Sequence, residues 1–165
     1  AASTSAVAGN MSRSSSTVLL LFLALLPGLG CSADRAWSLN QAAEFSAAYA
    51  TWKSLPREHY AVEVRISCFC PAGQWAHLEV RHDSVVALVL VSGDSVPREE
   101  WRSWPTVDGI FSILRDAYAS DQYASISARF DRAAGFPTRA ALSLPRSAVD
   151  GNLTVEARHY LPMAR

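Results

Sequence analysis

The sequence lacks an excess of charge of either sign. Its 165 residues include 15 lysine and arginine residues and 15 aspartate and glutamate residues, so the formal net charge is zero. A nucleic-acid-binding protein needs a basic surplus to displace counterions from phosphate groups. The composition therefore argues against a nucleic-acid partner. Half of the residues are hydrophobic, which is enough to build the core of one folded domain.

The sequence also lacks the short motifs of common enzyme classes. It contains no Gly-x-Ser-x-Gly nucleophile elbow and no Cys-x-x-Cys redox motif. Its four histidines and three cysteines show no recognisable ligand spacing, so we expect no metal and no cofactor. A binding or structural role is favoured over an enzymatic one. A hydrolase whose Ser, His and Asp meet only in space is one alternative.

No apolar run is long enough to cross a bilayer. The longest, residues 18–26, has nine residues, whereas a membrane-spanning helix needs about 20. It follows Met11 and the basic Arg13, and this order is typical of a secretory signal peptide. We take Met11 as the initiator, which makes residues 1–10 an upstream extension.

Residues 29–32, Leu-Gly-Cys-Ser, follow the apolar run. They resemble the lipobox of bacterial lipoproteins, in which leucine and small residues precede an invariable cysteine. The resemblance implies that residues 11–30 are removed as a signal peptide and that Cys31 is acylated. Several acyl chains, each contributing about 0.8 kcal/mol per buried methylene, anchor a domain durably. We expect a membrane-anchored protein of the bacterial cell envelope, with residues 31–35 as its tether. The alternative is an ordinary signal peptide with a chance cysteine.

Residues 36–165 are expected to form one α+β domain. Helical spacing or strand alternation predicts the order α-β-β-β-α-β-β-β, with an antiparallel sheet and helices packed on one face. The predicted helices cover residues 38–54 and 107–119, and the predicted strands cover residues 60–68, 74–82, 85–91, 125–131, 139–144 and 153–161.

Four local features refine this prediction. Thr106 can cap the second helix, and residues 82–84 suit a tight turn. Gly135 suits a turn that needs a positive φ. Residues 85–91 are apolar at alternate and intervening positions alike, which predicts a strand covered on both faces.

Cys68 and Cys70 end the first predicted strand. Residues i and i+2 of a strand point to the same face, so both sulfurs are expected at the edge of the core. Paired cysteines of exported proteins are normally oxidised. The pair is either structural, as a disulfide or two packed thiols, or a redox pair. We expect the structural role because a buried thiol resists ionisation.

Trp101, Arg102 and Trp104 lie in a predicted loop. Trp and Arg are enriched at binding hot spots, so an exposed loop would be the best interaction surface of the chain. A buried loop would instead be a hydrophobic plug under the second helix. Because the segment has neither helical nor strand periodicity, we predict that it contributes more to binding than to stability. Its partner would be an envelope protein or a small ligand.

Three segments together resemble a known family. Residues 68–71 are Cys-Phe-Cys-Pro, residues 107–111 open the second helix, and residues 130–138 end in Gly-Phe-Pro-Thr. The set is similar to an uncharacterised family of bacterial lipoproteins and secreted proteins, and the similarity covers about residues 52–160. It implies the fold and an envelope location, and it brings no known activity or catalytic residue.

Overall fold

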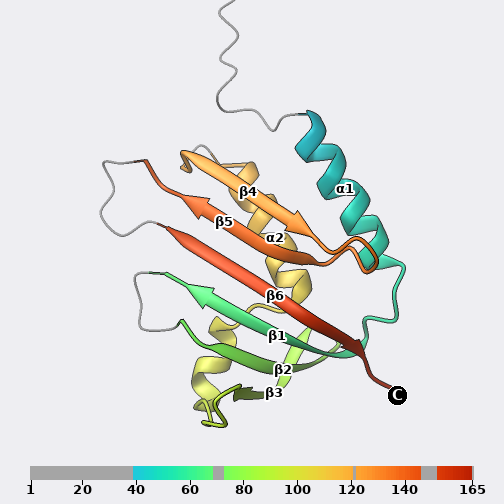
Figure 1. Cartoon of the computed structure of the whole chain (residues 1–165), viewed down its shortest axis with the longest axis vertical. Helices are drawn as coiled ribbons and strands as arrows, with labels where there is room; N and C mark the ends of the chain where they lie inside the picture. The colour runs from blue at the N-terminus through green and yellow to red at the C-terminus, as the bar shows by residue number, and fades with distance from the viewer. Residues whose placement is uncertain (1–38, 69–72, 121, 146–151, 165) are drawn as a thin grey trace, which may run out of the picture. The chain divides into compact units, whose positions relative to one another are not determined.

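The computed structural model describes residues 39–68, 73–120, 122–145 and 152–164. Helices and strands follow the predicted order, with one additional short 3-10 helix, η1 (Figure 1). The elements are α1 (Leu39–Lys53), β1 (His59–Ser67), β2 (Trp75–Arg81), β3 (Ser84–Leu90), η1 (Arg98–Ser103), α2 (Val107–Tyr118), β4 (Ser125–Phe130), β5 (Pro137–Ser143) and β6 (Leu153–Pro162).

The six strands form one sheet in the order β3-β2-β1-β6-β5-β4, and every neighbouring pair is antiparallel. Figure 1 shows α2 behind the sheet, so that the face toward the viewer carries none of the described helices. The predicted α+β class is confirmed. β6 lies in the middle of the sheet, between β1 and β5, although it is the last of the six strands along the chain.

The core lies between the sheet and the helices. On β2 the alternation predicted from sequence is confirmed, because Ala76, Leu78 and Val80 are fully buried. Each fully buried aliphatic side chain of Val or Leu size contributes about 1.5–3 kcal/mol. The buried stripe of α2 consists of Val107, Ile110, Phe111, Leu114 and Ala117.

β3 differs from the prediction. Among its side chains only Leu88 is buried, whereas Val86 is 42% exposed and Val89 is 40% exposed. The expectation that this strand is covered on both faces is wrong. The physical reason is its position, since β3 is an edge strand and α2 covers one face of the sheet only.

The turn between β4 and β5 brings the backbone against α1. Gly135 has a φ of +74°, as its predicted place in a turn requires. A Cβ atom added to Gly135 would lie 2.3 Å from the carbonyl oxygen of Ala48 and 2.9 Å from the amide nitrogen of Trp52. The missing side chain therefore allows α1 and this turn to touch through their backbones, and the next residue, Phe136, is buried.

Candidate functional site

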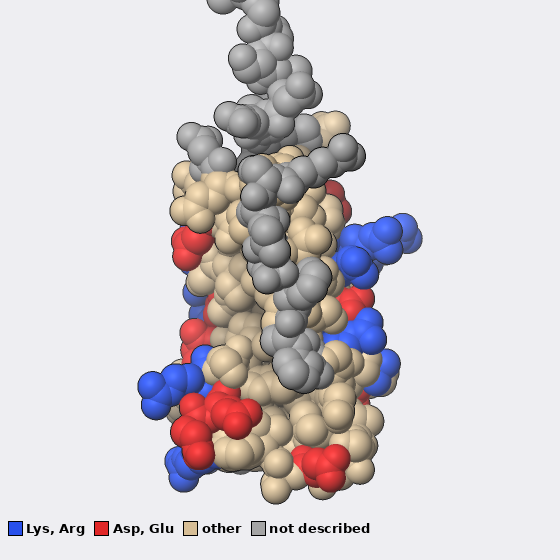
Figure 2. Space-filling model, turned by 90° about the vertical axis from the view of Figure 1, so that its left-hand side faces the viewer, with Lys and Arg blue, Asp and Glu red and all other residues tan. Residues whose placement is uncertain are grey.

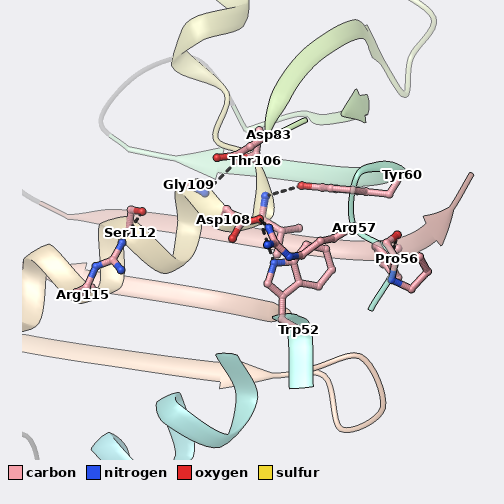
Figure 3. A network of polar contacts seen from close by, with 12 residues as sticks. Trp52, Pro56, Arg57, Tyr60, Asp83, Thr106, Asp108, Gly109, Ser112 and Arg115 are labelled. Atoms are coloured by element: carbon pink, nitrogen blue, oxygen red, sulfur yellow. Dashed lines mark hydrogen bonds and ion pairs between the residues drawn. The ribbon is translucent and has the colours of Figure 1, made fainter. Parts of the chain in front are cut away.

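The N-terminus of α2 is held by side chains from other elements (Figure 3). The Thr106 hydroxyl accepts a hydrogen bond from the amide of Gly109 at 3.0 Å, which confirms the predicted cap. The buried Tyr60 hydroxyl of β1 accepts one from the amide of Val107 at 3.1 Å. Two of the amides that a helix start leaves unpaired are thus satisfied. Burial raises the pKa of the Tyr60 hydroxyl well above its ordinary value, so the phenol is neutral.

Asp108, in the first turn of α2, joins this helix to the end of α1. Its Oδ2 accepts a hydrogen bond from the indole Nε1 of Trp52 at 3.2 Å and one from Nη1 of Arg57, also at 3.2 Å. A carboxylate in this place is favoured by the positive end of the helix dipole. Arg57 is fixed as a result, together with the segment between α1 and β1 that carries it.

The turn between β2 and β3 is fixed at both of its residues. His82 and Asp83 have φ values of 49° and 57°, which is the geometry of a two-residue hairpin turn and confirms the predicted turn. The His82 amide donates to the carbonyl oxygen of Glu58 at 2.8 Å. The Thr106 hydroxyl donates to the Asp83 carboxylate. The turn therefore forms a fixed corner between β1 and α2.

Among the described residues, three hollows surround this corner. The first, which we call the α1–β1 hollow, has a volume of about 420 Å³. A second of about 400 Å³ adjoins it and shares Glu58, His59 and His82 with it. The third, the η1 hollow, has a volume of about 430 Å³ and lies between η1 and the start of β3. The α1–β1 hollow is lined by Lys53, Leu55, Pro56, Arg57, Glu58, His59, His82, Asp83 and Met163.

The sheet face that no described helix covers carries a second polar network. Glu156 of β6 pairs with Arg65 of β1 and with Arg139 of β5. The guanidinium groups of Arg65 and Arg158 lie 4.9 and 3.9 Å from the ring centroid of Trp75. These contacts tie the central strands together through side chains, and they leave a face with both signs of charge.

Charges of both signs also mix elsewhere on the surface. Figure 2 shows the side that lies at the left of Figure 1, where acidic and basic side chains are interspersed among uncharged ones. Among the residues coloured there, no extended area carries a single sign. This distribution agrees with the equal totals of acidic and basic residues.

Glu63 of β1 lies beside a bulge in β6. Its Oε2 is 2.7 Å from Nε of Arg158 and 3.2 Å from Nδ1 of His159, a residue with a φ of 55°. Desolvation raises the pKa of Glu63, but the hydrogen bonds and charges of Arg158 and His159 outweigh it and lower that pKa overall. The ionised form of Glu63 is therefore favoured by folding.

Replacing Glu63 by glutamine is expected to lower the free energy of unfolding at pH 7, because the pairing with Arg158 loses its charge. A depressed pKa contributes stability above the unfolded-state value, and this contribution is lost as the pH falls through the folded-state value. The cost of Glu63→Gln should therefore shrink below pH 4.5, the ordinary value for this carboxyl. Urea unfolding at pH 7 and near pH 3 measures it. Equal costs at both pH values would contradict the pairing, and exposed Glu99 provides the control substitution.

A comparison with protein families identifies the chain's relatives. A model of the family of unknown function DUF6174 matches residues 44–160. The chain belongs to this family. The expectation of a domain of unknown function is thus confirmed. Neither a curated protein nor a solved structure matches the chain. The part matched to DUF6174 runs from within α1 to within β6, so it includes the corner formed by His82 and Asp83.

The cysteines of this DUF6174 protein differ from the prediction in one respect. β1 ends at Ser67, and Cys68 lies just beyond it with an exposed side chain. The expectation that Cys68 points to the edge of the core is wrong, because the strand ends before it. Cys68 is disulfide-bonded. Cys31 and Cys70 lie outside the described residues, and the structural role expected of the Cys68 and Cys70 pair stays a prediction.

The predicted interaction loop is partly core in this DUF6174 domain. Residues 98–103 form η1, and Trp104 after it is only 8% exposed and belongs to the core. For Trp104 the alternative of a buried hydrophobic side chain is correct, since it is part of the core cluster. Trp101 is half-buried and its Nε1 donates to the carbonyl oxygen of Val96 at 2.9 Å. Arg102 is exposed, and both of these residues line the η1 hollow.

Two absences hold for the residues that the structure describes. Within them, no group of three or more His, Cys, Asp and Glu side chains is placed to hold a metal ion. None of the described helices has the length and apolarity that a bilayer crossing requires.

Sequence reasoning did not identify the residues around the α1–β1 hollow. Arg57 and Asp108 are 51 positions apart, and only Asp108 lies in one of the segments that resemble the family. The local signal that did exist was the placement of Asp108 in a first helical turn, which predicts a favourable charge but not its partner.

Proposed function

We propose that this protein is a bacterial envelope lipoprotein, held to a membrane through acyl chains on Cys31, whose folded domain binds another envelope component without catalysing a reaction. The observation that carries the anchoring is the order of sequence signals: a basic residue, the apolar run of residues 18–26, and the lipobox-like residues 29–32.

The state of Cys68 supports the exported location. Disulfides form and persist in oxidising compartments such as the bacterial periplasm, and they are rare in the cytosol. Cys68 is disulfide-bonded, and the sequence contains only two other cysteines. Acylation would consume the thiol of Cys31, so we propose that Cys68 pairs with Cys70.

The use of polar groups at the corner supports binding over catalysis. The Asp83 carboxylate accepts a hydrogen bond from the Thr106 hydroxyl. The Asp108 carboxylate accepts hydrogen bonds from Trp52 and Arg57. These carboxylates position α2, and burial keeps the neighbouring Tyr60 phenol neutral. What the corner offers to a ligand is a set of hollows with fixed walls.

Labelling with radioactive palmitate tests the anchor. The wild-type chain is expected to incorporate the label, and Cys31→Ala is expected to abolish it, because no other residue of residues 29–32 can be acylated on sulfur. Ser32→Ala is the matched control and should retain the label. Label in Cys31→Ala, or no label in the wild-type protein, would refute the proposal; the second result would favour an ordinary signal peptide.

A further inference from the structure

The α1–β1 hollow has walls that are fixed before any ligand arrives. The Tyr160 hydroxyl donates to the carbonyl oxygen of Pro56 at 3.3 Å. The Met163 amide donates to the carbonyl oxygen of His59 at 2.9 Å. With the bond between His82 and Glu58 already described, the segment after α1, the β2–β3 turn and the end of β6 are held together. Such pre-formed hollows of several hundred cubic ångströms are typical of small-ligand sites.

Cationic donors line one part of this hollow. Arg57 is held by one nitrogen against Asp108, and its side chain is 30% exposed. A guanidinium has five N–H donors in a rigid plane, so the bond to Asp108 orients the remaining donors. Lys53, the single lysine of the sequence, ends α1 with an exposed side chain. The exposed His82 is a third nitrogen-bearing group.

Two acidic groups, Asp83 and Glu58, line the same hollow. The Asp83 carboxylate accepts a hydrogen bond from the Thr106 hydroxyl through one of its oxygens. Both ring nitrogens of His59 are already hydrogen-bonded, one to Glu79 at 2.8 Å and the other to the carbonyl oxygen of Ala164 at 3.1 Å. His59 is therefore part of the wall of the hollow and not a group that binds the ligand.

The rest of the lining is apolar. Leu55, Pro56 and Met163 provide hydrocarbon surface beside the cationic donors. Met163 is a large hydrophobic residue, yet it is 39% exposed. A bound ligand could therefore bury part of its side chain. A ligand that fits both parts carries one anionic group on a short apolar body.

We infer that the α1–β1 hollow binds a small amphiphilic anion, with its carboxylate or phosphate against Arg57 and Lys53 and its apolar body against Leu55, Pro56 and Met163. Arg57 can bind either anion with two parallel N–H donors, and Lys53 adds a point charge. This inference rests on the proposed binding role and names the ligand class.

Three short probes test this assignment: propionate, propyl phosphate and 1-propanol. Each probe is titrated at pH 7 into the processed protein. If the protein is lipidated, it is kept in a non-ionic detergent. The readout is the NMR shift of the Trp52 indole N–H, which is bonded to the same Asp108 oxygen as Arg57. We expect a saturable shift with propionate or propyl phosphate and none with 1-propanol, and the anion with the lower Kd identifies the head group. No saturable shift with either anion, or an equal one with 1-propanol, would overturn the inference.

Variants locate the anion. Arg57→Gln is expected to raise the Kd about tenfold, and Lys53→Gln about threefold. Arg102→Gln removes an exposed charge of the η1 hollow and should leave the Kd unchanged. Arg57 also stabilises the start of α2, so Arg57→Gln could unfold the protein. In that case the Kd of Lys53→Gln alone tests where the anion binds. Unchanged affinity in Lys53→Gln would place the anion elsewhere. The measurement does not depend on acylation of Cys31, so it can fail or succeed separately from the anchor.

Discussion

Replacing Gly135 by alanine is expected to lower the free energy of unfolding by about 2–5 kcal/mol. Two costs add. The φ of +74° is a conformation that a residue with a Cβ atom adopts only with strain. The new Cβ would also lie 2.3 Å from the carbonyl oxygen of Ala48, which is backbone of α1 and cannot rotate away. Urea unfolding measures the loss.

Gly93→Ala is the matched control for this substitution. Gly93 also has a positive φ, +97°, but a Cβ atom added there meets nothing within 4 Å. It should cost only the conformational part, about 1–2 kcal/mol. The difference between the two variants measures the close approach of the turn to α1. Equal losses would mean that α1 moves aside without cost.

Replacing Trp104 by alanine is expected to cost about 3–5 kcal/mol, because it removes a large side chain that is only 8% exposed and leaves a cavity in the core. The melting temperature should fall by about 10 °C or more. This expectation reverses the one drawn from sequence, in which the segment mattered more for binding than for stability. Thermal unfolding followed by circular dichroism measures the change.

Arg102→Ala supplies the contrast from the same segment. Arg102 is exposed, so its removal should change the free energy of unfolding by no more than about 0.5 kcal/mol. A small effect of Trp104→Ala, comparable to that of Arg102→Ala, would contradict the burial of Trp104. A large effect of both would mean that η1 as a whole contributes to the core.

Sequence periodicity identified most of the elements because their signals are local. The alternation of Ala76, Leu78 and Val80 repeats every second residue, and the inward face of a strand has the same period. The Thr106 cap needs only the amide of Gly109, three residues away. Such features depend on neighbours within one turn or one strand, so the sequence is sufficient to find them.

Features that depend on distant parts of the chain were missed or mistaken. The apolar composition of β3 does not reveal that the strand lies at a sheet edge, which leaves Val86 and Val89 exposed. Similarly, the lack of periodicity around Trp104 does not reveal that other elements bury it. The contact between Arg57 and Asp108 arises only when the end of α1 meets the start of α2.

The place of β6 in the sheet has a consequence for the order in which the protein can fold during synthesis. β1, β2 and β3 form one antiparallel group and β4 and β5 another, and each group meets β6 but not the other. A ribosome makes residues 153–162 after all of the other strands. Until then the two groups have no shared strand, and the chain cannot complete its sheet. The six-stranded sheet can therefore close only after nearly the whole chain has been made.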